Sequence, residues 1–344
     1  MRIERLDARD DVAMRAWHDT FLASHRHERP YAVPMMLEEV RAKLVADRET
    51  ERDLAFSGLL DGTVVSVGFM HLSMHDNLEQ AFVEVHTHPA HRRRGHGSTM
   101  LAHLEQVARE HGRTVLVTEV TYPYDAQPDG AGTGYVAFAR RHGFAFALAE
   151  VQRVLELPAD EEQLQGLVAE AEPHHVGYTF RQFEGAVPED IVESFAEIVG
   201  TLVSEAPSGD LEQETEVFDV ARIRADEEVF AASGRHKFTT AALDAAGDVA
   251  AYTDLVLPRY DPGHVYQWGT LVRPQDRGHR LGLAVKARNL LFAQPHLGRA
   301  TLVTFNAEVN SHMIGVNERM GFRPVERMGQ FQKRLGAPRP TVRA

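Results

Sequence analysis

The sequence predicts two tandem domains of the α/β (α+β) class, each a mixed, mostly antiparallel sheet flanked by helices. Three observations support this. The chain has 344 residues, a length that suits roughly two domains. Strand-like and helix-like periodicities alternate in both halves. Five landmarks of the first half also recur in the same order 178 to 187 residues later. They are Asp61-Gly62 and Ala246-Gly247, Pro89 and Pro274, Gly95 and Gly282, Leu116–Thr118 and Leu302–Thr304, and Gly143-Phe144 and Gly321-Phe322.

The first domain is expected over residues 1–157. Apolar residues at helical spacing, such as Trp17 and Phe21, indicate helices, and shorter extended apolar runs indicate strands. The pair Asp61-Gly62 favours a tight hairpin turn. Strands are expected over 1–6, 53–60, 63–74, 81–87, 114–121 and 144–157, and helices over 10–25, 36–48, 98–110 and 135–142.

A helical linker is expected over residues 158–175, followed by the second domain over 176–335. The second domain repeats the order of the first, with a hairpin around Gly247. Strands are expected over 177–183, 235–256, 265–272, 299–306 and from 322, and helices over 189–204, 217–226, 283–292 and 310–320. The Pro- and Arg-rich tail, 336–344, is expected to be disordered.

Composition narrows the function. The net charge of −13 argues against nucleic acid and anionic membranes as partners. The absence of cysteine excludes disulfides, thiolate nucleophiles and zinc–thiolate sites, and it suits a cytoplasmic protein. No apolar run approaches the roughly 20 residues that cross a bilayer, and the polar N-terminus does not resemble a signal peptide.

One stretch of the first half has the pattern of an anion site. The strand over 81–87 leads into a basic, glycine-containing loop and then into a helix. The start of a helix offers free N–H groups and partial positive charge, and glycines let a phosphate approach the backbone. The candidate ligands are Thr87, Arg92, Arg93, Arg94, Gly95, His96, Gly97 and Ser98. Their counterparts in the second half are Val272, Arg277, His279, Arg280, Leu281, Gly282, Leu283 and Ala284.

The two stretches resemble motif A of the GNAT superfamily of acyl-CoA-dependent N-acyltransferases, Arg/Gln-x-x-Gly-x-Gly/Ala. The first copy is Arg92–Gly97, and the second is His279–Ala284, in which His279 stands where Arg or Gln is usual. The resemblance covers nearly the whole chain and is similar in arrangement to the mycothiol-synthase-like tandem acetyltransferases. It implies direct transfer from an acyl-CoA, expected to be acetyl-CoA, to an amine in a ternary complex, without a metal.

The attacking amine needs a base, and two carboxylates are candidates. Glu84 lies in the strand before motif A, and Glu119 lies inside the apolar run 115–120. Either could instead face solvent or form a structural ion pair. In the second half Gly269 takes the place of Glu84, and Asp254 on the preceding strand is a possible substitute for it.

The resemblance also implies a general-acid tyrosine four residues before the Gly-Phe pairs, where this chain has Ala139 and Asn317. Tyr122, Tyr124 and Tyr135 are possible replacements. Asn306 and Asn310, together with Asn317, resemble the Asn-rich motif that contacts pantetheine in the family. The halves have therefore diverged, and we expect two acyl-CoA sites of unequal affinity, with the catalytic half left open.

The expected acceptor is a small-molecule amine, with a peptide or protein N-terminus as the alternative substrate and a non-catalytic CoA sensor as the alternative function. A monomer or a homodimer is expected. His86 and His88 share one strand face, but no further ligand completes a metal set, so we expect no metal. The segment His25–Arg29 is expected to be a solvated loop over the acceptor cleft.

Overall fold

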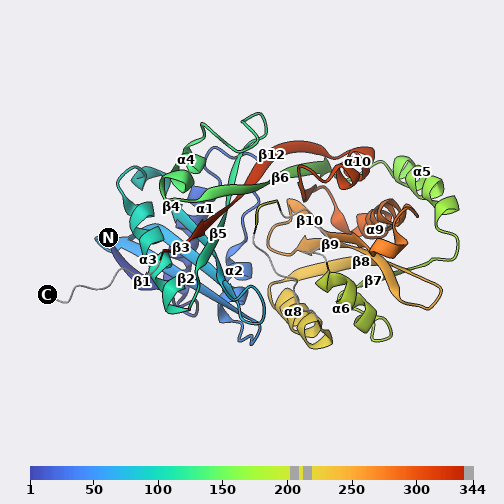
Figure 1. Ribbon diagram of the computed structural model, residues 1–344, viewed down its shortest axis with the longest axis horizontal. Coiled ribbons are helices and arrows are strands. Elements are labelled where there is room, and N and C mark those ends of the chain that lie inside the picture. Colours follow the sequence, from blue (N-terminus) through green and yellow to red (C-terminus); the bar gives the residue numbers. More distant parts are fainter. Residues whose placement is uncertain (202–208, 212–218, 337–344) are drawn as a thin grey trace. The chain divides into compact units, whose positions relative to one another are not determined.

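The computed structural model describes residues 1–201, 209–211 and 219–336, which form two compact units (Figure 1). Unit 1 comprises Met1–Tyr122, Ala126–Leu148 and the C-terminal stretch from Met328. Unit 2 comprises Pro123–Asp125 and Ala149–Arg327. The tail that the sequence predicts to be disordered lies outside the described residues from position 337 onward.

Unit 1 contains a mixed sheet in the order β1-β2-β3-β4-β5-β12. The pairs from β1 to β4 are antiparallel, whereas β4 and β5 are parallel and are joined by a crossover through helix α3. The tight turn predicted at Asp61-Gly62 joins β2 to β3, and both of its residues have positive φ. The strands are β1 (Arg2–Arg5), β2 (Glu51–Leu60), β3 (Thr63–Ser73), β4 (Gln80–Thr87), β5 (Val115–Pro123) and β12 (Arg323–Arg334).

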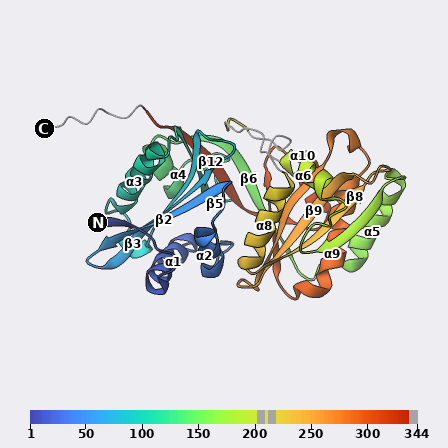
Figure 2. The ribbon, with the colours of Figure 1, turned by 90° about the horizontal axis from the view of Figure 1, so that it is seen from below.

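Four helices cover the sheet of unit 1, two on each face (Figure 2). Helices α1 (Asp11–His25) and α2 (Leu37–Val45) pack on one face, and α3 (His96–Glu110) and α4 (Gly134–Arg141) pack on the other. The side chain of Asp10 caps α1 by accepting hydrogen bonds from the N–H groups of Val12 and Ala13. Trp17 anchors α1, because it is buried and donates a hydrogen bond to the carbonyl of Phe56.

Unit 2 has a sheet in the order β6-β11-β10-β9-β8-β7, with β10 and β11 parallel. Helices α5, α9 and α10 contribute to the core on one face of this sheet, and α6 and α8 pack on the other. The strands are β6 (Ala145–Glu156), β7 (Thr179–Glu184), β8 (Arg235–Leu243), β9 (Val249–Pro258), β10 (His264–Val272) and β11 (Thr301–Ala307). The helices are α5 (Glu161–Ala171), α6 (Val192–Gly200), α8 (Val220–Ala232), α9 (Leu281–Leu297) and α10 (Ser311–Arg319).

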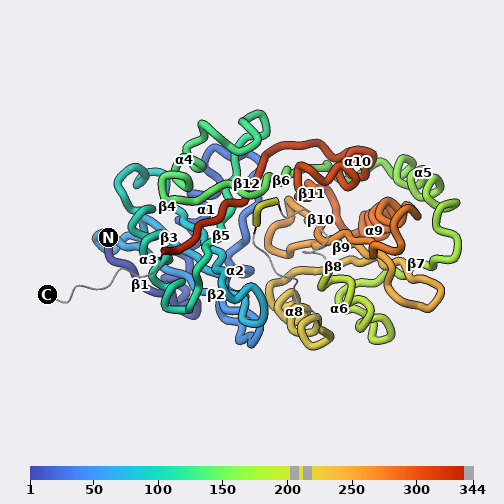
Figure 3. The backbone as a smooth tube through the Cα atoms, viewed as in Figure 1, coloured from blue at the N-terminus to red at the C-terminus, as the bar shows by residue number. Residues whose placement is uncertain are grey.

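In each unit the last strand of the sheet comes from a different part of the chain than the predicted domains imply. Unit 1 takes the strand beside β5 from the end of the chain (Figure 3). Phe331 on this strand is fully buried in the core of unit 1. Unit 2 takes the strand beside β11 from the middle of the chain, with Glu156 opposite Thr301 and Glu150 opposite Ala307. Sequence periodicity does not reveal this exchange, because it identifies a strand but not its partner.

Most of the predicted elements are present, with shifted ends. Helix α1 extends through His25, so the predicted solvated loop begins one residue later. Helix α8 begins at Val220 because Asp219 caps it, and positions 217 and 218 of the predicted helix lie outside the described residues, as do positions 202–204 of the preceding one. Among the described residues, no helix combines the length and the apolar character that crossing a membrane requires.

Candidate functional site

The loop between β4 and α3 leads into an open helix start. A 3-10 turn (Pro89–His91) follows Thr87, and Gly95, with φ 86°, lies immediately before α3. This left-handed conformation suits glycine because it has no Cβ. The first N–H groups of α3 have no carbonyl partner within the helix and, together with the helix dipole, attract anions. The first three residues of α3 are only half-buried, so solvent and ligands can reach this helix start.

Positive charge gathers around the same helix start. Arg93 and Arg94 are exposed, and in the described part of the chain no carboxylate forms an ion pair with either. Burial, followed by the positive charges of the N-terminal amino group, His91 and Arg94, lowers the pKa of His96. The loop can therefore accept an anion without losing an internal partner.

Thr87 and Gly97 bring the strand and the helix close together. A Cβ on Gly97 would lie 3.2 Å from Oγ1 of Thr87 and 3.5 Å from the ring of Phe138, so a larger residue would crowd this contact. Oγ1 of Thr87 lies within hydrogen-bond distance of Oγ of Ser66, at 3.1 Å. Ser98, the next predicted ligand, is hydrogen-bonded through its hydroxyl to Nε2 of His142 at 2.9 Å.

The guanidinium of Arg92 forms hydrogen bonds with other groups of the protein. Its guanidinium donates hydrogen bonds to the carbonyl of Thr87 (3.2 Å), to the hydroxyl of Tyr135 (3.0 Å), and to the carbonyl and hydroxyl of Ser24 (3.2 and 3.3 Å). These groups belong to the end of β4, the first turn of α4 and the last turn of α1. Arg92 therefore fixes the loop to both faces of the sheet.

The corresponding loop of unit 2 has the same backbone path. A 3-10 turn (Pro274–Asp276) follows Val272 and Arg273, and Arg277 then has φ −69° and ψ 157°, close to the −65° and 162° of Arg92. The left-handed residue before the helix is Arg280, with φ 53°, which takes the place of Gly95.

This geometry corrects the register that the sequence suggested. The match of Gly95 with Gly282 and of Arg92 with His279 was wrong by two residues. In the structure Arg277 holds the position of Arg92, and Gly282 that of Gly97. The error arose because Arg280, a residue that rarely has positive φ, stands where the motif has its first glycine.

The helix start of unit 2 is covered, unlike that of unit 1. Leu281, Leu283 and Ala284 are 1%, 4% and 0% exposed, and they pack in cores that include α5, β8 and β9. Gly282 is also buried, with Val272 beside it. The turn before α9, Arg277–Arg280, is itself exposed, so the difference from unit 1 lies in the first residues of the helix.

Polar side chains in the loop before α9 also form ion pairs and hydrogen bonds with other residues of unit 2. Arg280 forms an ion pair with Glu170 of α5, which also pairs with Arg319. Nδ1 of His279 donates a hydrogen bond to the carbonyl of His174. Asp276 accepts a hydrogen bond from Tyr178, which raises the pKa of Tyr178 to about 12. The loop is thus held by internal partners.

The central parallel strands of each sheet separate before they end. The last paired residues of β4 and β5 in the described chain are Phe82 and Val117, although both strands continue for at least five residues. In unit 2 the pairing of β10 and β11 stops at Tyr266 and Val303. Beyond these points the strand edges offer backbone groups to an extended ligand.

Glu84 and His86 lie just beyond this separation in unit 1. Glu84 is opposite Phe69 and His86 is opposite Val67 on β3, so both side chains lie on the face covered by α1 and α2. Oε2 of Glu84 is 3.8 Å from Nε2 of His86. Their side chains are 27% and 15% exposed, so the carboxylate can reach a ligand from a largely enclosed position.

Comparison with known proteins identifies the family. Residues 13–144 match the model of the acetyltransferase (GNAT) family. A solved tandem GNAT protein from the clavulanic acid biosynthesis pathway, without AcCoA, is 27% identical, with a TM-score of 0.79 over 98% of this chain and 99% of that one. Residues 13–144 therefore belong to the GNAT family by sequence, and the whole chain is similar in fold to a tandem GNAT protein.

Other structures share the fold. A GCN5-related N-acetyltransferase from Sphaerobacter thermophilus is 15% identical, with a TM-score of 0.61 over 99% of this chain and 98% of that one. The glucosamine N-acetyltransferase region of a fungal multi-domain GH3 β-N-acetylglucosaminidase is 13% identical, with a TM-score of 0.62 over 96% of this chain and 38% of that one. No curated protein sequence matches this chain. The GNAT fold implies an acyl-CoA co-substrate.

The two other candidate bases, Glu119 and Asp254, differ from Glu84 in their exposure and in their hydrogen-bond partners. Glu119 is exposed on β5, on the same sheet face as Val117. Asp254 in unit 2 accepts a hydrogen bond from Thr239 at 2.6 Å, which gives it a structural partner. Glu84 alone combines partial burial with a place at the strand separation.

The three tyrosines considered as general acids lie in different surroundings. Tyr122 is 1% exposed and donates a hydrogen bond to the carbonyl of Pro128, so its hydroxyl has a structural role. Tyr124 belongs to unit 2, where its ring lies under the guanidinium of Arg327. Tyr135 is 37% exposed, and its hydroxyl contacts Arg92 beside motif A.

The predicted pantetheine asparagines of unit 2 have internal partners. Asn310 caps α10 by accepting a hydrogen bond from the N–H of Met313 at 3.2 Å. Asn306 accepts one from Asn317, which is fully buried. Both contacts stabilise the segment between β11 and α10.

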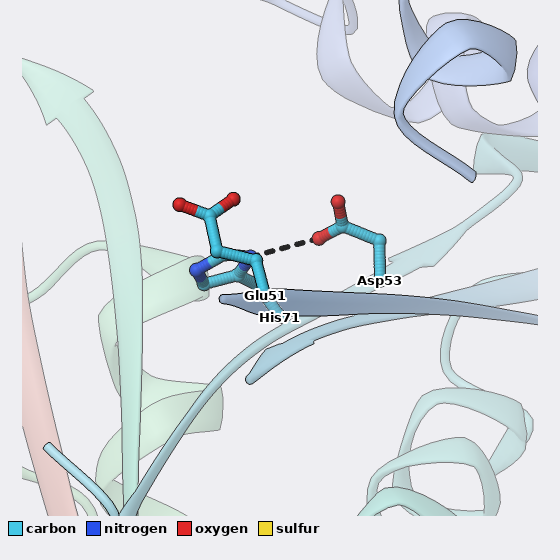
Figure 4. A group of neighbouring side chains, drawn as sticks. All are labelled: Glu51, Asp53 and His71. Atoms are coloured by element: carbon cyan, nitrogen blue, oxygen red, sulfur yellow. Dashed lines mark hydrogen bonds and ion pairs between the residues drawn. The ribbon is translucent and has the colours of Figure 1, made fainter. Parts of the chain in front are cut away.

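A cluster of Glu51, Asp53 and His71 on β2 and β3 has side chains that could bind a metal ion (Figure 4). Arg48 already supplies a positive charge there, pairing with Glu51 at 2.5 Å and with Asp53 at 3.2 Å. Burial would raise the pKa of Asp53, but the hydrogen bond from His71 and the charges of Lys43 and Arg48 lower it. The arrangement is therefore that of an ion-pair network.

Proposed function

We propose that unit 1 transfers an acetyl group from acetyl-CoA to the primary amine of a small molecule. The observation that carries this proposal is the combination of an open helix start and a half-buried carboxylate, both of which follow the point where β4 separates from β5. Unit 2 has neither feature, since its helix start is buried and Gly269 replaces Glu84.

The residues of unit 1 fit an acyl-CoA along its length. The N–H groups at the start of α3, with the guanidinium groups of Arg93 and Arg94, would hold the pyrophosphate. The edge of β4 beyond Phe82 would pair with the peptide-like pantetheine arm. When bound, the thioester supplies an activated acyl group, and the strand edge places it near Glu84.

Glu84 would take the proton of the acceptor amine, so that the amine attacks the acyl carbon directly. A thiolate is a good leaving group, so the loss of tyrosine at position 139 does not prevent transfer. No covalent intermediate on the protein is required, which suits a chain without cysteine. A backbone N–H of β4 would stabilise the oxyanion.

The charge of the chain favours a cationic acceptor. A net charge of −13 attracts amines in their ammonium form and raises their rate of encounter. The local positive charge at the start of α3 meanwhile favours the anionic donor. Unit 2 would bind acyl-CoA weakly, because Glu170 occupies the guanidinium of Arg280.

Release of CoA, followed with a thiol reagent, tests this function against a panel of small amines and N-terminal peptides. The protein contributes no signal, because it has no cysteine. Glu84→Gln should lower kcat about 100-fold or more, as expected for loss of a general base, and leave acetyl-CoA binding unchanged.

Glu119→Gln is the matched control and should retain the wild-type rate, because Glu119 is exposed. Equal losses in both variants would contradict the assignment of Glu84. Release of CoA with peptides but with none of the small amines would contradict the proposed acceptor class.

A further inference from the structure

A pair of histidines adjoins the proposed base. His86 on β4 faces His25 at the end of α1, with ring centroids 5.7 Å apart. The ring of Phe21 packs against both, at 4.8 Å from His86 and 5.3 Å from His25. With Nε2 of His86 3.8 Å from Glu84, the order in space is Glu84, His86, His25.

Each histidine of the pair has one buried ring nitrogen that forms no hydrogen bond with the described residues. Nε2 of His86 and Nδ1 of His25 are buried, and in the described chain neither has a hydrogen-bond partner. Buried polar atoms are satisfied in most proteins, and an exception calls for a specific explanation. If these rings served only to fill space, apolar side chains would do so without the desolvation cost.

The surroundings keep His25 neutral. Burial, then the positive charges of His86, Arg29 and Arg26, lowers its pKa well below the ordinary value. The titratable or charged groups on the elements around the pair are Glu84 on β4, Glu119 on β5, His18 on α1, Arg26 and Arg29 after α1, and Arg92 in the motif loop. A neutral imidazole can accept a proton at one nitrogen while it releases one from the other.

We propose that His86 and His25 form a relay that carries the acceptor's proton from Glu84 toward solvent. This inference rests on the proposed function. The amine proton passes to the carboxylate of Glu84, and Glu84 delivers it to Nε2 of His86. His86 then releases a proton from Nδ1 to Nδ1 of His25, directly or through a water molecule, between rings whose centroids are 5.7 Å apart. His25 releases a proton from Nε2. Both rings are then neutral again, each with its proton on the opposite nitrogen, and each regains its starting tautomer by ring rotation or by proton exchange through water before the next turnover.

The relay explains why the end of α1 is so firmly placed. Arg92 holds Ser24, the neighbour of His25, with two hydrogen bonds from the motif loop. The same arginine contacts the carbonyl of Thr87, the neighbour of His86. Both histidines are thereby fixed to the loop that would bind the donor. They act through Glu84 and are positioning residues.

Chemical rescue separates a relay from simple packing. We would measure kcat, KM and the pH profile of acetyl transfer for wild type, His86→Ala and His25→Ala, with and without added imidazole. Both variants should lose about 10-fold or more in kcat with little change in the KM for acetyl-CoA. The acid limb of the profile should also change, and imidazole should restore most of the rate.

Two controls match these variants. Phe21→Leu disturbs the same packing without a titratable group, and His103→Ala removes a half-buried histidine that packs on Phe56, away from the pair. Neither should respond to imidazole. Wild-type kcat in His86→Ala, or a loss that imidazole does not restore, would overturn the relay alone. A wild-type protein that acetylates no amine would overturn the proposed function and the relay together.

Discussion

At the scale of single residues, Arg92 shows how a motif residue can hold a loop in place through hydrogen bonds to other elements. Its guanidinium bonds to groups of β4, α1 and α4, and it lies 5.3 Å from the centre of the Tyr135 ring. The planar fork of arginine makes several such bonds in fixed directions, which a lysine cannot reproduce. Arg93 and Arg94 are exposed, and in the proposed function they contact the phosphates.

Arg92→Lys should therefore reduce stability as well as binding. We expect the free energy of unfolding to fall by about 1–3 kcal/mol through the lost hydrogen bonds. Affinity for acetyl-CoA should fall as well, because the loop loosens. Denaturant unfolding and calorimetric titration measure the two effects. Arg94→Lys is the control and should keep wild-type stability; a variant of Arg92 that loses binding but no stability would identify it as a direct ligand instead.

At the scale of elements, part of the site could be predicted from the sequence. Glu84 was visible as a carboxylate in the middle of a strand, and the open start of α3 as a glycine loop before a helix. His25 was predicted as the last residue of the helix over 10–25 and the first of a solvated loop, and its place beside His86 was missed because that contact joins residues far apart in the sequence. Glu170 could not be predicted, since it reaches Arg280 across 110 residues of sequence.

The last strand is the element whose place the sequence predicted least well. Phe331 on β12 is fully buried in the core of unit 1, where its ring packs against Phe146 at 5.6 Å. Phe331→Ala should lower the stability of unit 1 by about 3–5 kcal/mol, the usual cost of emptying a core phenylalanine site.

The two tryptophans report on the units separately, because Trp17 lies in unit 1 and Trp268 in unit 2. In a Trp268→Phe background, the fluorescence of Trp17 should show the loss caused by Phe331→Ala. Val309→Ala, at a 70% exposed position, is the control and should change little. If Phe331→Ala instead lowered only the stability reported by Trp268, measured in a Trp17→Phe background, the assignment of β12 to unit 1 would be contradicted.

At the scale of the whole molecule, many histidines are held neutral by the fold. Burial is the main cause that lowers the pKa of seven of them below 6.5: His18, His25, His96, His103, His111, His142 and His175. Below pH 6.5 the unfolded chain binds protons that the folded chain does not, so acid favours unfolding.

The free energy of unfolding should therefore fall as the pH drops from about 7.5 to 5, where carboxylates do not yet titrate. Urea unfolding at several pH values measures this slope, and His25→Gln should make it shallower. A free energy of unfolding that stays constant or increases over this range would contradict the neutral state of these histidines.

The two loops of the duplication differ, because the first residues of α3 are half-buried and those of α9 are buried, and we propose that only the first loop binds acetyl-CoA tightly. Calorimetric titration of acetyl-CoA into wild type, Gly97→Glu and Gly282→Glu tests it directly, because each substitution places a carboxylate at one helix start. We predict that Gly97→Glu removes the tight binding event and that Gly282→Glu leaves it intact. Loss of the tight event in Gly282→Glu, with wild-type binding in Gly97→Glu, would place the working site in unit 2 and contradict the account.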